Sequence, residues 1–201
     1  MFVTWKPPDR WSYSYLLGLY LGDGCITGRG TCRQLVIALD DAYPDLIECC
    51  WAAIQIVLPE CHVGRYRLKN NNSTRVVAAS SKWTAVFPQH GPGPEHERPI
   101  VLEPWQREIV DVFPREFLRG LIHSDGCRTM NRFKTKLPSG RVAEYAYPRY
   151  FFSNLSADIR GLFCEYCERL GIRWTQSNHR NISVSHRKCV ALLDEFVGPK
   201  R

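Results

Sequence analysis

Two aspartates are the residues of this chain best suited to do chemistry. Asp23 and Asp125 each end a mostly apolar run of helical length, each is followed at once by a glycine, and the two lie 102 positions apart. Glycine tolerates the left-handed backbone conformation that closes a helix, so both carboxylates are predicted at helix C-termini. The helix dipole disfavours an anion there, and bound cations would best explain two carboxylates placed in this way.

Small residues predict how the two helices meet. Gly18 and Gly22 lie four positions apart, as do Gly120 and Ser124, so each helix carries small side chains on one face. Packing of these faces against each other would bring the two aspartates together. An ordinary buried helix with a polar last turn explains a single copy equally well, but two copies in phase weaken that explanation.

The two segments that end in these aspartates resemble the motifs of the LAGLIDADG homing endonucleases, in the single-chain type that carries two motifs. The family's last motif aspartate matches Asp23 and Asp125, and its small helix-packing positions match the four residues named above. The chain departs from the motif at Leu21 and His123, where the family motif has its first aspartate. That position varies in the family and does not bind the metal.

The resemblance implies an α+β fold. Two pseudo-twofold related αββαββα halves would each carry a saddle-shaped antiparallel sheet, with the motif helices paired at their interface. The implied organisation is a first half at 1–88, a linker at 89–112 and a second half at 113–201. Hydrophobic periodicity and turn residues fit this order, because they predict helices at 12–24, 44–58, 81–87, 105–112, 114–126, 157–170 and 187–196, with strands within 25–40, 62–80, 127–136, 141–153, 172–176 and 181–185.

The resemblance also implies an activity, that of a site-specific double-strand DNA endonuclease encoded by an intron, an intein or another mobile element. Such an enzyme acts as a monomer on a duplex of roughly twenty base pairs and uses a divalent metal to activate water. The metal is normally Mg²⁺, and Mn²⁺ or Ca²⁺ can substitute for it in binding. Asp23 and Asp125 would be the shared ligands, joined by the backbone carbonyls of Gly22 and Ser124.

Further site residues are suggested by their place in each half. Lys82 and Lys188 follow the last strand of their halves and match the family's basic residue near the attacking water, although phosphate contact or simple solvation explains each lysine slightly better. Asp40 and Asn154 end the second strand of their halves and are weaker candidates to bind metal or water. His123 is predicted to face away from the second aspartate, because a helix turns through roughly 200° over two residues.

The charge of the chain favours a polyanionic partner. The formal net charge is +7, the isoelectric point is about 9.0, and 20 of the 27 basic residues are arginine. Arginine suits recognition of phosphates and guanine edges. A GC-rich coding sequence would explain part of this arginine excess, but not its clustering.

Strand alternation predicts where DNA would bind. Arg65, Arg67 and Lys69 would share one face of a strand while Tyr66 and Leu68 pack on the other, and residues 128–136 would present a second basic face. A β-ribbon of this kind fits the major groove, and the alternative for either strand alone is a solvated sheet face. The predicted DNA contacts are Arg29, Arg33, Arg65, Arg67, Lys69, Arg75, Arg128, Arg132, Lys134, Lys136, Arg141, Arg149 and Arg173.

The nine cysteines are predicted to be reduced thiols. Residues 1–8 lack the apolar core of a signal peptide, so an intracellular protein, cytoplasmic or nucleoid-associated and not secreted, is expected. Cys164 and Cys167 form a C-x-x-C within a predicted helix, and without a second pair at zinc-finger spacing they are interpreted as core residues rather than zinc ligands. No apolar run reaches the length of a membrane span, so no membrane partner is expected.

Other functions remain as alternatives. A sequence-specific DNA-binding regulator or an intron RNA maturase could use the same scaffold after loss of cleavage. Retention of both aspartates argues against lost cleavage, but it is compatible with a maturase that keeps them. A phosphate-binding or redox enzyme would need a glycine-rich loop after a strand or a strong cysteine pair, and the sequence has neither.

Overall fold

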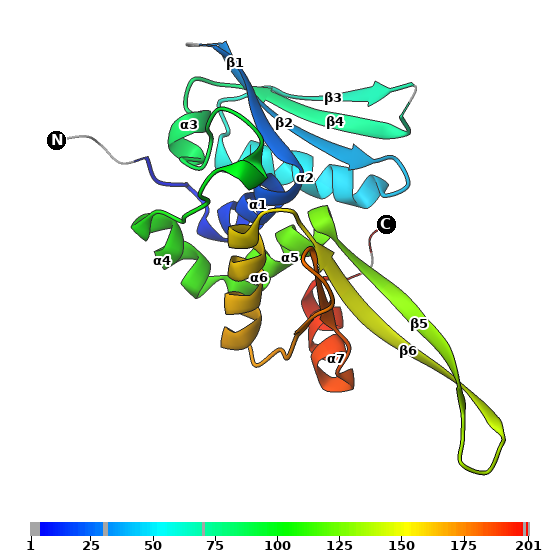
Figure 1. Cartoon of the computed structure of the whole chain (residues 1–201). Coiled ribbons are helices and arrows are strands. Elements are labelled where there is room, and N and C mark those ends of the chain that lie inside the picture. Colours follow the sequence, from blue (N-terminus) through cyan, green and yellow to red (C-terminus); the bar gives the residue numbers. More distant parts are fainter. Residues whose placement is uncertain (1–4, 30–31, 70, 199, 201) are drawn as a thin grey trace.

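The computed structural model describes residues 5–29, 32–69, 71–198 and 200 (Figure 1). Gly30, Asn70 and Pro199, which the sequence places in turns and after the last helix, lie outside the described residues. The first half consists of α1 (Arg10–Asp23), β1 (Gly24–Arg29), β2 (Cys32–Asp40), α2 (Pro44–Val57), β3 (Val63–Leu68), β4 (Ser73–Ala79) and α3 (Trp83–Val86).

A connection with the short helices η1 (Glu95–Glu97) and α4 (Pro104–Val112) leads to the second half. That half consists of α5 (Pro114–Asp125), β5 (Gly126–Lys136), β6 (Val142–Ser153), α6 (Ala157–Arg169), β7 (Thr175–Gln176), β8 (Asn181–Val184) and α7 (Arg187–Phe196). The strands form two four-stranded antiparallel sheets with matching orders, β1-β2-β4-β3 and β5-β6-β8-β7. The predicted α+β fold with two αββαββα halves is confirmed.

The ends of the motif helices differ in detail from prediction. Helix α1 is capped by Asp9, whose carboxylate accepts a hydrogen bond from the Ser12 backbone N–H at 2.7 Å, so the helix begins at Arg10 rather than at the predicted residue 12. Gly24 and Gly126 have negative φ values of −92° and −104°, and the predicted left-handed closure is also wrong. Glycine is needed there because a Cβ atom would lie 2.6 Å from Tyr20 Cα after α1, with the same crowding after α5.

The two motif helices pack backbone against backbone, as predicted. A Cβ atom on Gly18 would lie 2.9 Å from Gly120 Cα, and one on Gly120 would lie 2.9 Å from Gly18 Cα. Ser14 adds a hydrogen bond across the pair, because its hydroxyl donates to the Phe113 carbonyl at 2.8 Å. Helix α1 is buried continuously from Ser12 to Leu21, so this pair forms the centre of the molecule.

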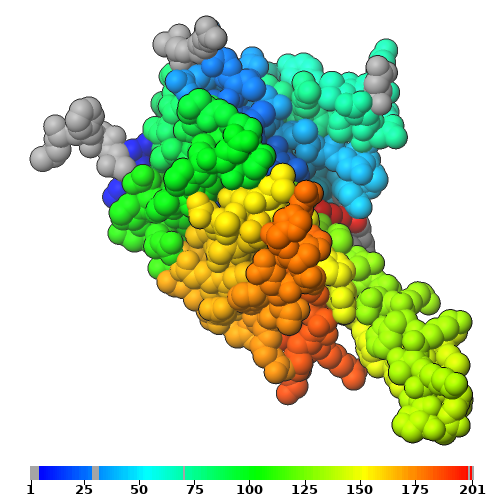
Figure 2. Space-filling model, in the orientation of Figure 1, coloured from blue at the N-terminus to red at the C-terminus, as the bar shows by residue number. Residues whose placement is uncertain are grey.

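Each sheet has one face covered by helices and one open face. Leu35, Ile37 and Leu39 alternate along β2 and are buried in the core of the first half, against which α2 packs. In the second half, Phe152 stacks on Phe163 of α6 with ring centroids 4.5 Å apart. The β5–β6 ribbon continues well beyond the helices and projects from the body of the molecule (Figures 1 and 2).

All nine cysteines are free thiols. Cys50, Cys164, Cys167 and Cys189 are buried, which agrees with their interpretation as core residues, whereas Cys25, Cys32 and Cys127 are exposed. Within the described residues, no group of three or more His, Cys, Asp or Glu side chains is arranged to hold a metal ion. A membrane-spanning helix is likewise not found in that part of the chain.

Candidate functional site

The C-termini of α1 and α5 bring the two motif aspartates together. A Cβ atom on Gly22 would touch the Ser124 side chain and lie 3.1 Å from Asp125 Oδ2, so the helix carrying Asp23 meets its partner at this point. Burial and the neighbouring charge of Asp125 raise the pKa of Asp23 to about 7. Two carboxylates partly removed from water and repelling each other form a site whose ionised state needs a cation.

Asn154 positions the second aspartate. Its side-chain amide donates to Asp125 Oδ2 at 2.6 Å, while its Oδ1 accepts from the Ser156 backbone N–H at 2.7 Å. Burial raises the pKa of Asp125, and the Asn154 hydrogen bond partly offsets that effect. Asn154 is thus next to an aspartate, whereas the Asp40 carboxylate accepts a hydrogen bond from the Ala42 backbone N–H at 2.9 Å.

Lys200 is a basic side chain that the structure brings to this centre. Its ammonium donates to the backbone carbonyl of Ser124 at 3.2 Å. Burial lowers the pKa of Lys200, while the charges of Asp23, Cys127, Asp125 and Asp40 raise it, in that order of size. No pattern in the sequence singles out Lys200, because it follows the last helix and reaches the centre only through the path of the chain.

The two lysines proposed from the sequence lie elsewhere. Lys82 forms an ion pair with Glu60 and follows β4, whose last residue Ala79 is in register with Gln34. Gly24, the residue after the first aspartate, is in register with Ile37, three residues further along β2. Lys188 is exposed in the first turn of α7, whereas the opposite end of that helix leads to the centre. The expectation that Lys82 and Lys188 stand beside the aspartates is therefore corrected.

The connection between the halves supplies a third carboxylate that the sequence analysis missed. Burial raises the pKa of Glu95 to about 7, with Arg98 opposing the shift and Asp125 adding to it. Glu95 Oε1 is buried and has no hydrogen-bond partner among the described residues. The connection is packed rather than simply extended, since Arg98 donates to the carbonyls of Gln89 and Gly93 at 3.1 and 2.8 Å.

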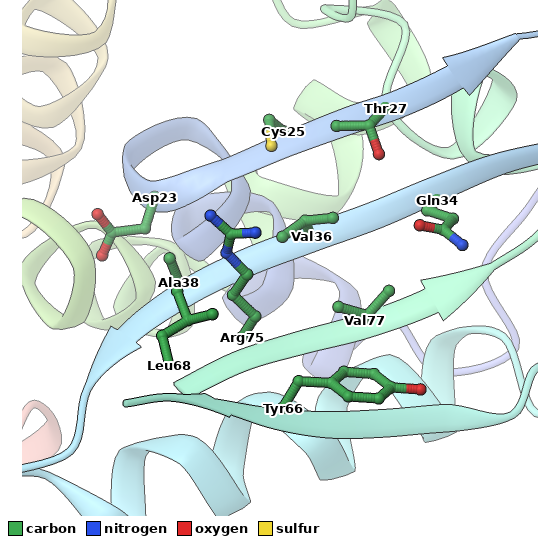
Figure 3. A pocket seen from close by; sticks show the side chains of 10 residues that line it. All are labelled: Asp23, Cys25, Thr27, Gln34, Val36, Ala38, Tyr66, Leu68, Arg75 and Val77. Atoms are coloured by element: carbon green, nitrogen blue, oxygen red, sulfur yellow. The ribbon is translucent and has the colours of Figure 1, made fainter. Parts of the chain in front are cut away.

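The open face of the first sheet forms a groove of about 500 Å³ that begins at Asp23 (Figure 3). The Arg75 side chain extends across β2 toward Asp23 and Cys25. Burial raises the pKa of the Cys25 thiol, and the charge of Arg75 partly offsets that rise. The groove is lined by Asp23, Cys25, Thr27, Gln34, Val36, Ala38, Tyr66, Leu68, Arg75 and Val77. Arg75 is thus a predicted DNA contact that lies on the open face.

The basic side of β3 faces the helices, contrary to prediction. Arg65 forms an ion pair with Glu48 and lies over the Trp51 ring of α2, 5.4 Å from its centroid. Arg67 donates to Asp41 Oδ2 at 2.8 Å. Tyr66 and Leu68, predicted to pack, line the groove instead, and Lys69 is exposed just after the strand. Alternate residues of a strand lie on the same face, so Arg65 and Arg67 lie on the side of β3 that carries the buried Val63. That side packs against the helices, and the two arginines are therefore not on the open face.

The basic side of β5 also faces the helices, contrary to prediction. Arg128 makes two hydrogen bonds to Asp194 of α7, at 2.7 and 2.9 Å, and lies opposite the buried Tyr150, so its strand parity belongs to the helix-covered face. Arg132, Lys134 and Lys136 have that same parity, and Lys134 pairs with Glu144 across the ribbon. The prediction that these basic residues of β5 share the face directed at the DNA major groove is corrected. The aromatic side chains of β6 that pack against the helices determine which face of the sheet is covered.

The other face of the β5–β6 ribbon carries Arg149. Its guanidinium lies 5.3 Å from the Phe151 ring centroid, and its Nε is buried with no hydrogen-bond partner among the described residues. Among the other predicted contacts, Arg141 is exposed in the ribbon turn, Arg173 is exposed after α6, and Arg33 is half-buried on the helix side of β2. The backbone of Arg29 ends β1, opposite Cys32.

His123 faces away from the aspartates, as predicted. Its Nδ1 accepts from the Tyr15 hydroxyl at 2.9 Å and its Nε2 donates to the Val197 carbonyl at 3.0 Å, since a carbonyl can only accept. Burial lowers the pKa of His123 to about 4. The imidazole is therefore neutral and ties the end of α7 to both motif helices.

The fold is similar to that of several solved structures. The meganuclease I-AabMI bound to uncleaved DNA aligns with a TM-score of 0.56 at 14% identity, over 94% of this chain and 82% of its own. I-DmoI in complex with DNA and Mn aligns with a TM-score of 0.60 at 16% identity, over 94% of this chain and 97% of its own. No family model and no curated protein sequence matches the chain.

A further structural neighbour has a different name. Full-length DUF199/WhiA from Thermatoga maritima aligns with a TM-score of 0.60 at 17% identity, over 99% of this chain but 59% of its own. The architecture is thus shared between chains named as meganucleases and one that is not. Paired motif helices, two matching sheets and these likenesses together show that the chain has the fold of the LAGLIDADG homing endonucleases.

Proposed function

We propose that this protein is a site-specific double-strand DNA endonuclease. The observation that carries the proposal is the meeting of Asp23 and Asp125 at the ends of two helices, buried enough to raise the pKa of both carboxyls. Burying two neighbouring carboxylates in their ionised form is unfavourable, and a bound cation would offset that cost. The DNA complexes of I-AabMI and I-DmoI support a duplex DNA partner.

The donor set at this centre fits a hard divalent cation such as Mg²⁺. Carboxylate oxygens of Asp23 and Asp125 would hold it, and the backbone carbonyls of Gly22 and Ser124 are oxygen donors on the same two helix ends. When bound, the metal supplies positive charge at the cleaved phosphate and lowers the pKa of the attacking water. Mn²⁺ or Ca²⁺ would occupy the same oxygens.

The chain's own residues would prepare this chemistry. Asn154 fixes the orientation of Asp125 through its 2.6 Å hydrogen bond. Lys200 adds a positive charge beside both carboxylates, where it would favour their ionised state and attract a phosphate oxygen. Arg75, reaching over the groove from β4, would contact a phosphate of the strand being cut.

The proposal extends to the setting of the activity. The protein would act inside the cell as a monomer, because one chain already contains both halves and both aspartates, and it would serve the mobility of an intron or intein. Its site would span roughly twenty base pairs, as the resemblance to the homing endonucleases implies. Exposed basic residues, among them Arg132, Lys136, Arg141 and Arg173, would add phosphate contacts at the edges.

A non-cleaving DNA-binding regulator or an RNA maturase is the second candidate, because the likeness to WhiA extends this architecture beyond chains named as meganucleases. One experiment distinguishes the two functions. Duplexes that the protein binds would be selected from a random library, and the selected site would then be incubated with the protein and Mg²⁺. Linear product from wild type, and none from Asp23→Asn or Asp125→Asn at equal binding, supports the endonuclease. Tight binding without nicking by wild type in Mg²⁺ or Mn²⁺ overturns it.

A further inference from the structure

Three aromatic rings form a ladder on the projecting β5–β6 ribbon. The Phe133 and Tyr145 ring centroids lie 5.4 Å apart with planes inclined by 29°, and those of Tyr145 and Tyr147 lie 6.0 Å apart with planes inclined by 17°. Phe133 is 44% exposed and Tyr147 is 50% exposed. Contiguous exposed aromatic surface of this kind marks a binding surface in a soluble protein.

Strand register places this ladder on the open face. Phe133 lies opposite Tyr145, and both share parity with Phe151 and Arg149, whereas the opposite parity contains Tyr150, which packs beneath α7. The ladder therefore continues the surface that begins at the motif aspartates. Phe133 and Tyr147 are exposed, and the β5–β6 ribbon that carries them projects from the body of the molecule (Figure 1), so core packing does not explain the ladder.

The ribbon that carries the ladder is basic, which indicates the class of partner. Arg149 lies on the ladder's own face, where its guanidinium is next to the Phe151 ring. Arg141 lies in the turn that joins β5 to β6, whereas Arg132, Lys134 and Lys136 have the opposite parity to Phe133 and flank the ladder from the other face of the ribbon. Aromatic side chains within a basic ribbon suit nucleic acid, and a two-stranded ribbon fits the major groove of a duplex.

We propose that the ladder of Phe133, Tyr145 and Tyr147 selects thymines in one half of the DNA site by contacting their C5-methyl groups in the major groove. This inference rests on the proposed function, because it requires a duplex DNA site. Thymine is the one base that presents a methyl group in that groove. Phe133 has no hydrogen-bonding atom in its side chain, so it can recognise a base edge only by apolar contact.

The geometry favours methyl contact over base stacking. All three pairs of rings are in contact, because the Phe133 and Tyr147 centroids also lie 6.1 Å apart, so the rings direct their faces mainly at one another. Stacking of unpaired bases needs free ring faces. Duplex DNA is therefore favoured over single-stranded DNA as the partner, and the experiment below compares binding of the two.

The test removes the methyl groups without changing base pairing. The protein would first be used to select duplex sites, and every thymine in the half bound by the ribbon would then be replaced by deoxyuridine. Wild type is expected to bind the uracil duplex about 15- to 60-fold more weakly, since two or three methyl groups are lost and burial of each contributes roughly a factor of four. Phe133→Ala is expected to bind both duplexes weakly and to reduce the thymine preference to less than threefold, which a double-mutant cycle measures.

Met130 provides the matched control. It is 43% exposed on the same strand but has the opposite parity, so Met130→Ala should keep the full thymine preference. Equal binding of thymine and uracil duplexes by wild type overturns the inference while leaving the endonuclease intact. Retention of the thymine preference by Phe133→Ala also overturns it, as does tighter binding of the single strand than of the duplex. Failure to bind any duplex overturns the proposed function as well.

Discussion

Asp23 and Asp125 dominate the electrostatics of the molecule. Burial and mutual repulsion hold the pKa of Asp23 near 7, whereas in the unfolded chain it is near 4. Between these two pH values the folded state keeps a proton that the unfolded state releases. The carboxyl therefore reduces stability progressively as the pH rises from about 4 to about 7, and above 7 the full cost is present.

Because ionised Asp23 destabilises the folded state, its removal should stabilise the protein. Asp23→Asn should raise the free energy of unfolding at pH 7.5 by about 1–2 kcal/mol, a value below the full pKa difference because the side chain is only partly buried. At pH 4 the gain should vanish, because wild-type Asp23 is then protonated in the folded state. Urea unfolding at the two pH values measures both, and loss of stability at pH 7.5 would contradict the assigned repulsion.

His123 has the opposite pH dependence. Its folded pKa of about 4 lies below the ordinary value of 6.5, so the unfolded chain takes up a proton first as the pH falls. His123→Ala should cost about 2–3 kcal/mol at pH 7.5, because the Tyr15 hydroxyl loses its partner and the Val197 carbonyl loses its donor. At pH 5 the cost should be smaller, since wild type has already lost part of this stabilisation. An equal cost at both pH values would contradict the depressed pKa.

These residues show what the sequence can predict about the site. Asp23, Asp125 and their small neighbours are recognisable because helix spacing is local and repeats after 102 positions. Lys200 and Glu95 are not, because they approach the aspartates only after the chain end and the inter-half connection have folded across the helix pair. Periodicity contains no information about such paths.

The contact between α1 and α5 depends on residues with no side chain. A Cβ atom on Gly18 would lie 2.9 Å from Gly120 Cα and 2.8 Å from the Leu121 backbone nitrogen. Gly18→Ala should therefore force the helices apart and destabilise the protein by about 3 kcal/mol or more. Gly161 is the matched control, because it lies in α6 with nothing within 4 Å of its Cβ position. Gly161→Ala should stabilise by about 0.5–1 kcal/mol. Thermal unfolding of both variants tests the packing, and equal effects would contradict it.

The strand faces show why the sequence alone predicts the wrong open side for β3 and β5. The alternation of charge along each strand predicts a basic open face, yet Arg65 of β3 lies over Trp51 of α2 and Arg128 of β5 donates to Asp194 of α7. The buried Val63 in β3 and the buried Tyr150 opposite β5 determine which face packs against the helices. Each is a single residue, which is too weak a signal in the alternation of apolar and polar residues to assign the face. The elements themselves were predictable, whereas their orientation depended on tertiary packing.

Arg75 and Arg65 give a direct test of this orientation. Arg75→Ala should weaken binding to the selected duplex and reduce the slope of log affinity against log salt by about one, because it removes a phosphate contact from the open face. Arg65→Ala removes the same charge from the opposite face and should leave the salt slope unchanged. Fluorescence anisotropy across a salt series measures both slopes. A larger effect from Arg65→Ala than from Arg75→Ala would instead place the arginine side of β3 against DNA, as the sequence predicts.

The two halves share a topology but not a size, and under the proposed function this inequality would shape the whole DNA site. Strands β5 and β6 pair over eleven residues, whereas β1 and β2 pair over six. A single chain with unequal halves has no reason to recognise a palindrome, because each sheet covers a different length of groove. The longer ribbon extends the second half outward (Figure 2).

Shortening the ribbon tests this asymmetry. Residues 133–145 would be replaced by an Asn-Gly hairpin turn between Arg132 and Ala146, which face each other in register. The removed strand segment is mostly exposed, so the variant should fold with unchanged urea midpoint and should still cut its site with Mg²⁺. Its selected site should lose several base pairs on one side only, because each removed strand residue spans about 3.3 Å of groove and each base pair about 3.4 Å. Sequencing of cleaved library members measures the loss on each side. Symmetrical loss, or no loss, would show that the ribbon does not read DNA.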